Sequence, residues 1–152
     1  MGVYRFEDLR VWQAAKRQCD LVGALLLRAA FRSDRALSDQ MNAAALSVMF
    51  NISEGFLRRR NKETLQFLRY AFASNGELKA AFYAAEGRKY LAADETAELI
   101  ALNESIAKML RRWQATLTPN GPRTQDQGRT EDQERTEDQE RTKNQGPSTK
   151  DG

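Results

Sequence analysis

The chain has 152 residues, one cysteine and no histidine, and its formal net charge at pH 7 is +3. A chain of this length predicts one domain, and a single cysteine excludes an intramolecular disulfide. Without histidine, the side chain most often used for general acid–base catalysis is missing. No run reaches the roughly 18 apolar residues of a membrane-spanning helix, and the first residues lack the apolar core of a signal peptide. We therefore expect a cytoplasmic protein.

Composition divides the chain near residue 118. Residues 119–152 contain no aliphatic or aromatic side chain and repeat a hexapeptide related to RTEDQE. Such a segment cannot bury enough apolar surface to offset the entropy of ordering it. The sequence thus predicts a folded domain over residues 1–118 and a solvated tail over residues 119–152, disordered or transiently helical. A regulatory or partner-binding role for this tail stays open.

Charge differs between the two parts, with a net +5 on residues 1–118 and −2 on residues 119–152. A basic domain suggests a polyanionic partner, although ordinary solubilising charge would produce the same excess.

Apolar residues recur at steps of three and four, which predicts four amphipathic helices. The helices are expected over about residues 7–30, 34–57, 62–90 and 94–117, with no strand pattern between them. Short connections join helices that run in opposite directions, so we predict an all-α fold, an up-down-up-down antiparallel four-helix bundle. The first helix is expected to bury Leu9, Trp12, Ala15, Cys19, Val22, Leu26 and Ala29.

Several local features follow from this pattern. Ser33 or Asp34 is expected to cap the second helix and Asn61 the third, because short polar side chains accept hydrogen bonds from the first helical amides. Cys19 is expected to act as a small buried hydrophobe. Gly76 lies inside the third helix, where glycine is unfavourable, and therefore predicts a close contact with a neighbouring helix.

The densest positive charge lies between the second and third helices, at Arg58, Arg59, Arg60 and Lys62. These side chains can neutralise phosphates, which releases counterions and makes binding salt-dependent. Equally, cations that follow a helix complement its dipole and can simply remain solvated. Arg69 is expected to extend the patch only where the assembly brings it alongside.

Other residues have side chains that could bind a metal, stack on a base or take part in catalysis. Carboxylates such as Glu54 and Glu77 in a four-helix bundle can bind metals, but such sites also use histidine, so we expect no metal and no cofactor. Glu54 is expected to pair with a neighbouring arginine or to cap a contact between subunits. Trp113 beside two arginines could stack on single strands, but its place on the apolar stripe favours a core position. With no nucleophile elbow and no phosphate-binding loop, we expect no catalytic residue and no enzymatic activity.

A family resemblance spans about residues 6–117. It is carried by the opening segment Phe6-Glu7-Asp8-Leu9-Arg10-Val11-Trp12-Gln13, by the central Asn51-Ile52-Ser53-Glu54-Gly55-Phe56 with Arg58-Arg59, Lys62-Glu63 and Phe67-Leu68, and by Ser74 and Glu77-Leu78. These fragments resemble a bacterial four-helix-bundle family. The family includes proteins encoded in intervening sequences of large-subunit ribosomal RNA genes and the accessory variability determinants of diversity-generating retroelements.

The resemblance implies a homo-oligomer, often a homopentamer, without known catalytic chemistry. In the retroelement group, the basic surface binds nucleic acid and a reverse transcriptase. Glu54, Gly55, Phe56 and Glu77 fall in the resembling segments and are expected to be motif or oligomer-contact residues.

Two departures from the family pattern bear on function. Asn42 and Ala43 stand where the family commonly has two arginines, and Met49 stands where it commonly has a proline, which would kink a helix. The first departure leaves the nucleic-acid surface dependent on the Arg58–Lys62 corner, or weaker than in relatives. We expect an oligomeric accessory protein that binds RNA or DNA; the alternative is an intervening-sequence type of protein-interaction scaffold without direct nucleic-acid binding.

Overall fold

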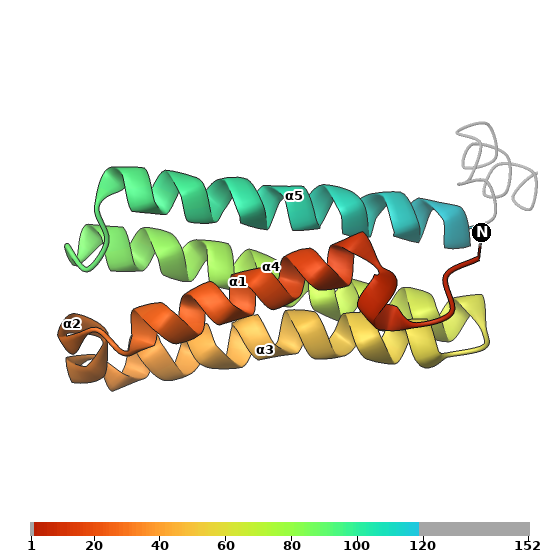
Figure 1. Ribbon diagram of the computed structural model, residues 1–152, viewed down its shortest axis with the longest axis horizontal. Coiled ribbons are helices and arrows are strands. Elements are labelled where there is room, and N and C mark those ends of the chain that lie inside the picture. Colours follow the sequence, from red (N-terminus) through yellow and green to blue (C-terminus); the bar gives the residue numbers. More distant parts are fainter. Residues whose placement is uncertain (1, 119–152) are drawn as a thin grey trace, which may run out of the picture. The chain divides into compact units, whose positions relative to one another are not determined.

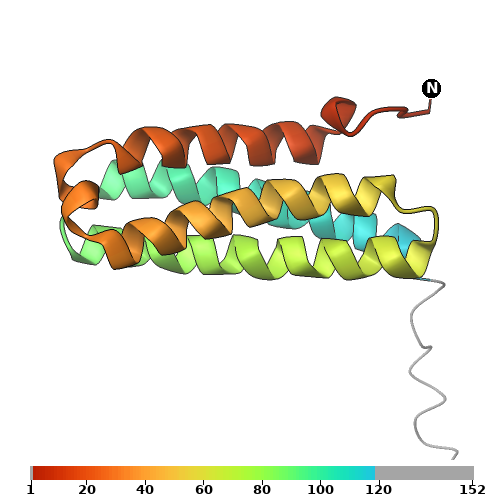
Figure 2. The same cartoon turned by 90° about the horizontal axis from the view of Figure 1, so that it is seen from below.

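The computed structural model describes residues 2–118, and the predicted repeat tail lies outside these residues. Its elements are η1 (Phe6–Asp8), α1 (Arg10–Leu26), α2 (Ala29–Ser33), α3 (Arg35–Leu57), α4 (Asn61–Gly87) and α5 (Ala93–Leu117). No strand occurs within residues 2–118, which confirms the all-α prediction. The long helices α1, α3, α4 and α5 lie alongside one another (Figures 1 and 2), with α3 packed on α4, α4 on α5, and α1 on both α3 and α5.

The predicted first helix is divided into three pieces. Helix α1 ends at Leu26, the backbone of Arg28 is extended, and the short helix α2 follows. This break carries Phe31, which was expected in a loop, into the core, where its ring is fully buried and meets the Tyr90 ring at 5.5 Å. Burial of a whole aromatic side chain offsets the interruption of the helix. Glu7, expected in the first turn of this helix, lies instead in the separate turn η1.

The buried face of α1 is rotated from the expected stripe. Leu9, Trp12, Cys19 and Leu26 are only partly buried, and Ala29 is exposed. The difference arises because a polar residue, Gln18, occupies the centre of the buried face. A prediction based only on the spacing of apolar residues does not include it. The buried residues of α1 are Val11, Ala15, Gln18, Val22 and Leu25.

One of the predicted caps is confirmed. Asp34 precedes α3 and its Oδ1 accepts a hydrogen bond from the Leu37 amide at 3.2 Å. The prediction for Asn61 is wrong, because Asn61 is the first residue of α4, and Arg60 occupies the cap position without a side-chain cap. At α5 the Glu95 side chain accepts from the Ala92 amide at 3.0 Å.

The close helix contact lies at a different glycine from the one predicted. A Cβ added at Gly76 would meet no heavy atom within 4 Å, so Gly76 faces open space. A Cβ added at Gly55 would lie 3.3 Å from the Phe67 Cβ and 3.4 Å from the Thr64 backbone oxygen. Helices α3 and α4 therefore approach each other closely at Gly55, beside the basic corner.

The core consists of two apolar clusters with a polar layer between them. One cluster gathers residues from the end of α1, α2, the first half of α3, the second half of α4, the turn after it and the start of α5, including Phe31, Met41 and Phe82. The other cluster lies toward the α3–α4 loop and comprises Val11, Ala15, Val48, Ile52, Leu68, Ala71, Ile106 and Leu110.

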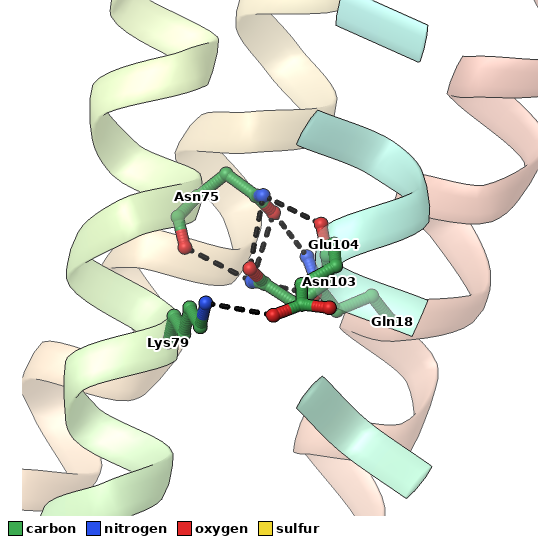
Figure 3. A network of polar contacts seen from close by, with 5 residues as sticks. All are labelled: Gln18, Asn75, Lys79, Asn103 and Glu104. Carbon is green, nitrogen blue, oxygen red and sulfur yellow. Dashed lines mark hydrogen bonds and ion pairs between the residues drawn. The ribbon is translucent and has the colours of Figure 1, made fainter. Parts of the chain in front are cut away.

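The polar layer consists of Gln18, Asn75 and Asn103 on α1, α4 and α5, each at most 1% exposed (Figure 3). Gln18 Nε2 donates to Asn75 Oδ1 at 3.1 Å, and Asn103 Nδ2 donates to Gln18 Oε1 at 3.0 Å. The two asparagine side chains also donate to each other's backbone carbonyls, both at 2.9 Å. Every buried polar side-chain atom in residues 2–118 has a partner, so the layer costs little and joins three helices at one level.

Candidate nucleic-acid interface

Positive charge is concentrated in one half of the folded unit. We define the basic half as residues 2–17, 48–74 and 104–118, on the α3–α4 loop side of the polar layer, and the acidic half as residues 19–46 and 76–102. The basic half has twelve Lys and Arg residues against five Asp and Glu, and the acidic half has six against eight. The net charges are +7 and −2, so the whole positive excess of the domain lies on one side of the layer.

Few cations of the basic half have a carboxylate partner. In residues 2–118, its only ion-paired cations are Arg5, Lys16 and Arg58. In the acidic half, three of six cations are paired, namely Arg28, Lys79 and Arg88. The positive field of the basic half is therefore largely uncompensated at short range.

Arg58 is held at the corner by contacts with its own chain. It follows α3 as the cap residue, its Nη2 donates to Glu54 Oε2 at 2.8 Å, and its guanidinium lies over the Phe67 ring at 4.7 Å from the centroid. The expected pairing of Glu54 with an arginine is thus confirmed. The same pairing reduces what Arg58 can offer to an external phosphate.

Arg59, Arg60 and Lys62 are exposed and have no carboxylate within ion-pair distance in the described chain. They lead directly into the 27-residue helix α4, whose first turn lacks a side-chain cap. The amides of a helix's first turn point outward along the axis and attract negative charge. Cationic side chains and free amides are therefore adjacent at this point.

Arg69 and Arg111 extend this surface along α4. Arg69 is seven residues after Lys62, so the two lie on nearly the same line of the helix, about 10 Å apart along its axis. Arg111 comes from α5 and lies over the Phe72 ring at 5.0 Å from the centroid, on the flank of α4. We call Arg59, Arg60, Lys62, Arg69 and Arg111 the basic ridge.

The other predicted site residues do not reach the ridge. Gly55 is buried against α4, and Phe56 is partly buried beside it. Glu77 is exposed on the part of α4 that lies in the acidic half. Trp113 is partly buried against the second apolar cluster, in agreement with the core position that its stripe favours.

Contacts bring the separate motif segments together. Trp12 of the opening segment donates from Nε1 to Ser53 Oγ of the central segment at 2.9 Å. Ser74 shares a hydrogen bond with Ser47 across the α3–α4 seam at 2.7 Å. The two contacts join α1 to α3 and α3 to α4, so these residues help to set how the three helices pack.

Arg111 was not expected in this surface. Its place depends on the packing of α5 on α4, which is also seen where Gln114 Nε2 donates to the Leu68 carbonyl at 3.1 Å. The only sign of this position in the sequence is the pair Arg111-Arg112, two adjacent cations in the last turns of an amphipathic helix.

A groove of about 800 Å³ lies elsewhere, between α1 and α5. Arg28 spans the groove, and its Nη2 donates a hydrogen bond to Glu95 Oε1 at 2.7 Å. This hydrogen bond and the one that the Glu95 carboxylate accepts from the Ala92 amide lower the pKa of Glu95. Its rim also carries Arg17 and Glu98. Because its charges balance, this groove does not select for a polyanion.

Metal-binding and membrane-spanning features are also absent from residues 2–118. This part of the chain holds no cluster of three or more Cys, Asp or Glu side chains placed to share a metal ion. None of its helices combines the length and the hydropathy needed to cross a bilayer.

Comparison with known protein families identifies a match over most of the described residues. The model of the family described as 23S rRNA-intervening sequence protein matches residues 7–112. Comparison with curated proteins gives none. The matched range includes the opening segment, the corner between α3 and α4, and α5 as far as the arginine pair. The chain belongs to the 23S rRNA-intervening sequence protein family.

Proposed function

We propose that this chain is a non-enzymatic accessory protein that binds RNA, alone or in an RNA–protein complex, through the basic ridge. The observation that carries the proposal is the set of exposed ridge cations without carboxylate partners, in a half with a net charge of +7. The family description names an RNA gene, and a role connected with RNA is compatible with it. Binding of DNA through the same cations is the nearest variant.

Phosphate contacts would supply most of the affinity. Each neutralised phosphate releases counterions, and arginine grips a phosphate with two parallel hydrogen bonds. We further propose that α1, α3, α4 and α5 act as an up-down-up-down bundle that assembles as a homo-oligomer, in the form of the pentamer that the resemblance implies. Repetition of the ridge around such an assembly would turn weak single-site contacts into useful avidity.

A salt titration of RNA binding tests the proposal. Fluorescence anisotropy of a labelled single-stranded RNA is measured from about 50 to about 200 mM salt for the wild type and for an Arg59→Glu, Arg60→Glu double variant. The double variant should bind more weakly, and loss of two phosphate contacts should reduce the log–log salt slope by about 1.4.

The matched control is Arg32→Glu, Arg35→Glu, which makes the same charge change on two exposed cations of the acidic half. Its affinity and salt slope should lie closer to those of the wild type. Equal losses for the two double variants would mean that net charge, and not the ridge, controls binding. Absence of binding by the wild type at the lowest salt would refute the function.

A second candidate is a protein-docking scaffold, as for a reverse transcriptase in a retroelement. It is favoured by apolar side chains that remain exposed on α3, with Phe50 at 55% and Leu57 at 62%. Co-purification of a neighbouring gene product that survives nuclease treatment, and is lost in Phe50→Ser, would support the scaffold over direct RNA binding. An adjacent reverse-transcriptase gene would identify the retroelement lineage.

A further inference from the structure

Helix α4 carries an aromatic pair, and one member of it, Tyr70, directly follows the ridge residue Arg69. Phe67 and Tyr70 meet edge to face, with centroids 6.1 Å apart and planes at 83°. Arg58 covers one face of Phe67 and, through Glu54, is fixed to α3. Phe67 is thereby held between α3 and α4, and its ring contacts the Tyr70 ring.

Tyr70 is the open member of this pair. Half of it is exposed, at 50%, although it belongs to a well-packed helix. It directly follows Arg69 in the chain, so its ring leaves α4 about 100° around the helix from the Lys62–Arg69 line. A strand whose phosphates follow that line would have its bases within reach of the aromatic side.

We propose that the nucleic acid on the basic ridge is single-stranded and that one of its bases stacks on Tyr70. This inference rests on the proposed function and specifies its ligand. Aromatic side chains beside a basic track bind single strands through the faces of successive bases, with little dependence on sequence. In a duplex those faces are covered by neighbouring pairs, and only phosphates and groove edges remain accessible.

The arrangement also distinguishes Tyr70 from an ordinary exposed tyrosine. Tyr83 is exposed to a similar degree, 53%, on the same helix, but it lies in the acidic half. Tyr83 has the same chemistry without the ridge. It is therefore the matched control for the ring at position 70.

Three labelled ligands of about 12 nucleotides separate stacking from charge: an RNA single strand, its duplex, and an abasic strand with equally many phosphates. The wild type should bind the base-bearing strand more tightly than either other ligand. Tyr70→Leu should weaken its binding by about fivefold to about 150-fold and leave the abasic strand unaffected. Tyr70→Phe should keep the preference, and Tyr83→Leu should resemble the wild type.

Other results would overturn the inference. If Tyr70→Leu leaves the base-bearing strand unchanged, or weakens both strands equally, then no base stacks at this position, whereas the proposed function would survive. If light scattering shows that Tyr70→Leu changes the assembly mass, the ring is a contact between copies of the chain. Failure of the wild type to bind all three ligands at low salt would instead refute the proposed function itself.

Discussion

Replacing Asn75 with leucine should be the most damaging single change in the buried amide layer. Within residues 2–118, Asn75 Oδ1 is the sole acceptor for Gln18 Nε2, and Asn75 Nδ2 is the sole donor to Asn103 Oδ1. The substitution therefore leaves two buried polar atoms without partners. At about 1–3 kcal/mol for each, the free energy of unfolding should fall by about 2–6 kcal/mol.

The other two positions should cost less, in a fixed order. Asn103→Leu makes the same change of shape but leaves only one buried atom without a partner, Gln18 Oε1. Asn75 Oδ1 still accepts from Gln18 Nε2, and Asn75 Nδ2 still donates to the backbone carbonyl of residue 103. Its expected cost is about 1–3 kcal/mol. Gln18→Met nearly preserves volume and leaves both asparagines satisfied by each other, so its cost should stay below about 1.5 kcal/mol.

Urea denaturation followed by far-UV circular dichroism measures these differences through linear extrapolation. The double variant Gln18→Met, Asn75→Leu should be less destabilised than the two single changes added together, because removal of Gln18 also removes one of the two unpartnered atoms. A Gln18→Met variant as unstable as Asn75→Leu, or simple additivity in the double variant, would refute this account of the layer.

Three further predictions concern other parts of the domain. In Gly76→Ala the added methyl group enters open space, and the free energy of unfolding should rise by about 1 kcal/mol. In Gly55→Ala the added methyl group crowds the α3–α4 contact, and the free energy of unfolding should fall by up to about 2 kcal/mol. Both changes are measured from urea denaturation midpoints. The lowered pKa of Glu95 beside Arg28 stabilises the fold above the ordinary carboxyl pKa, and this contribution is lost as pH falls through the folded-state value. Glu95→Gln should thus be less stable than wild type near neutral pH and equal to it in acid, and a constant gap across a pH series of melts would contradict the ion pair. Burial raises the pKa of the Cys19 thiol, so iodoacetamide should alkylate it more slowly in the native chain than in urea at the same pH, and equal rates would show that the thiol is open to solvent.

Periodicity predicted the helical segments well because apolar side chains recur with the helical repeat. The ends of α3 were found within one residue, since Asp34 caps the start and the arginine run follows the end. The break before α2 was missed because its cause is the burial of Phe31 against Tyr90, a contact between residues far apart in sequence. Local pattern carries no record of such a contact.

The amide layer was missed for a related reason. In the sequence, Gln18, Asn75 and Asn103 look like solvent-facing residues. Their mutual hydrogen bonds offset the free-energy cost of burying their polar groups. The shift of the buried face of α1 follows from the same error, because Gln18 sits at its centre.

The candidate site was predictable in part. A cluster of four cations is visible in the sequence, as is the spacing of Glu54 four residues before Arg58, which suits an ion pair on a helix. The approach of Arg111 to Phe72 depends on how α5 packs on α4. The division of charge by the polar layer likewise appears only when the helices are placed side by side.

That division has a consequence for encounter kinetics. The described residues are charged +7 at one end and −2 at the other and therefore have a large electric dipole moment, which the field of the proposed nucleic-acid partner would turn before any contact forms. The torque acts over roughly one Debye length, about 10 Å at 0.1 M salt. If the partner is a nucleic acid, as proposed, then acidic residues far from the ridge, such as Asp94 and Glu98, should help to set how often a collision arrives in the productive orientation.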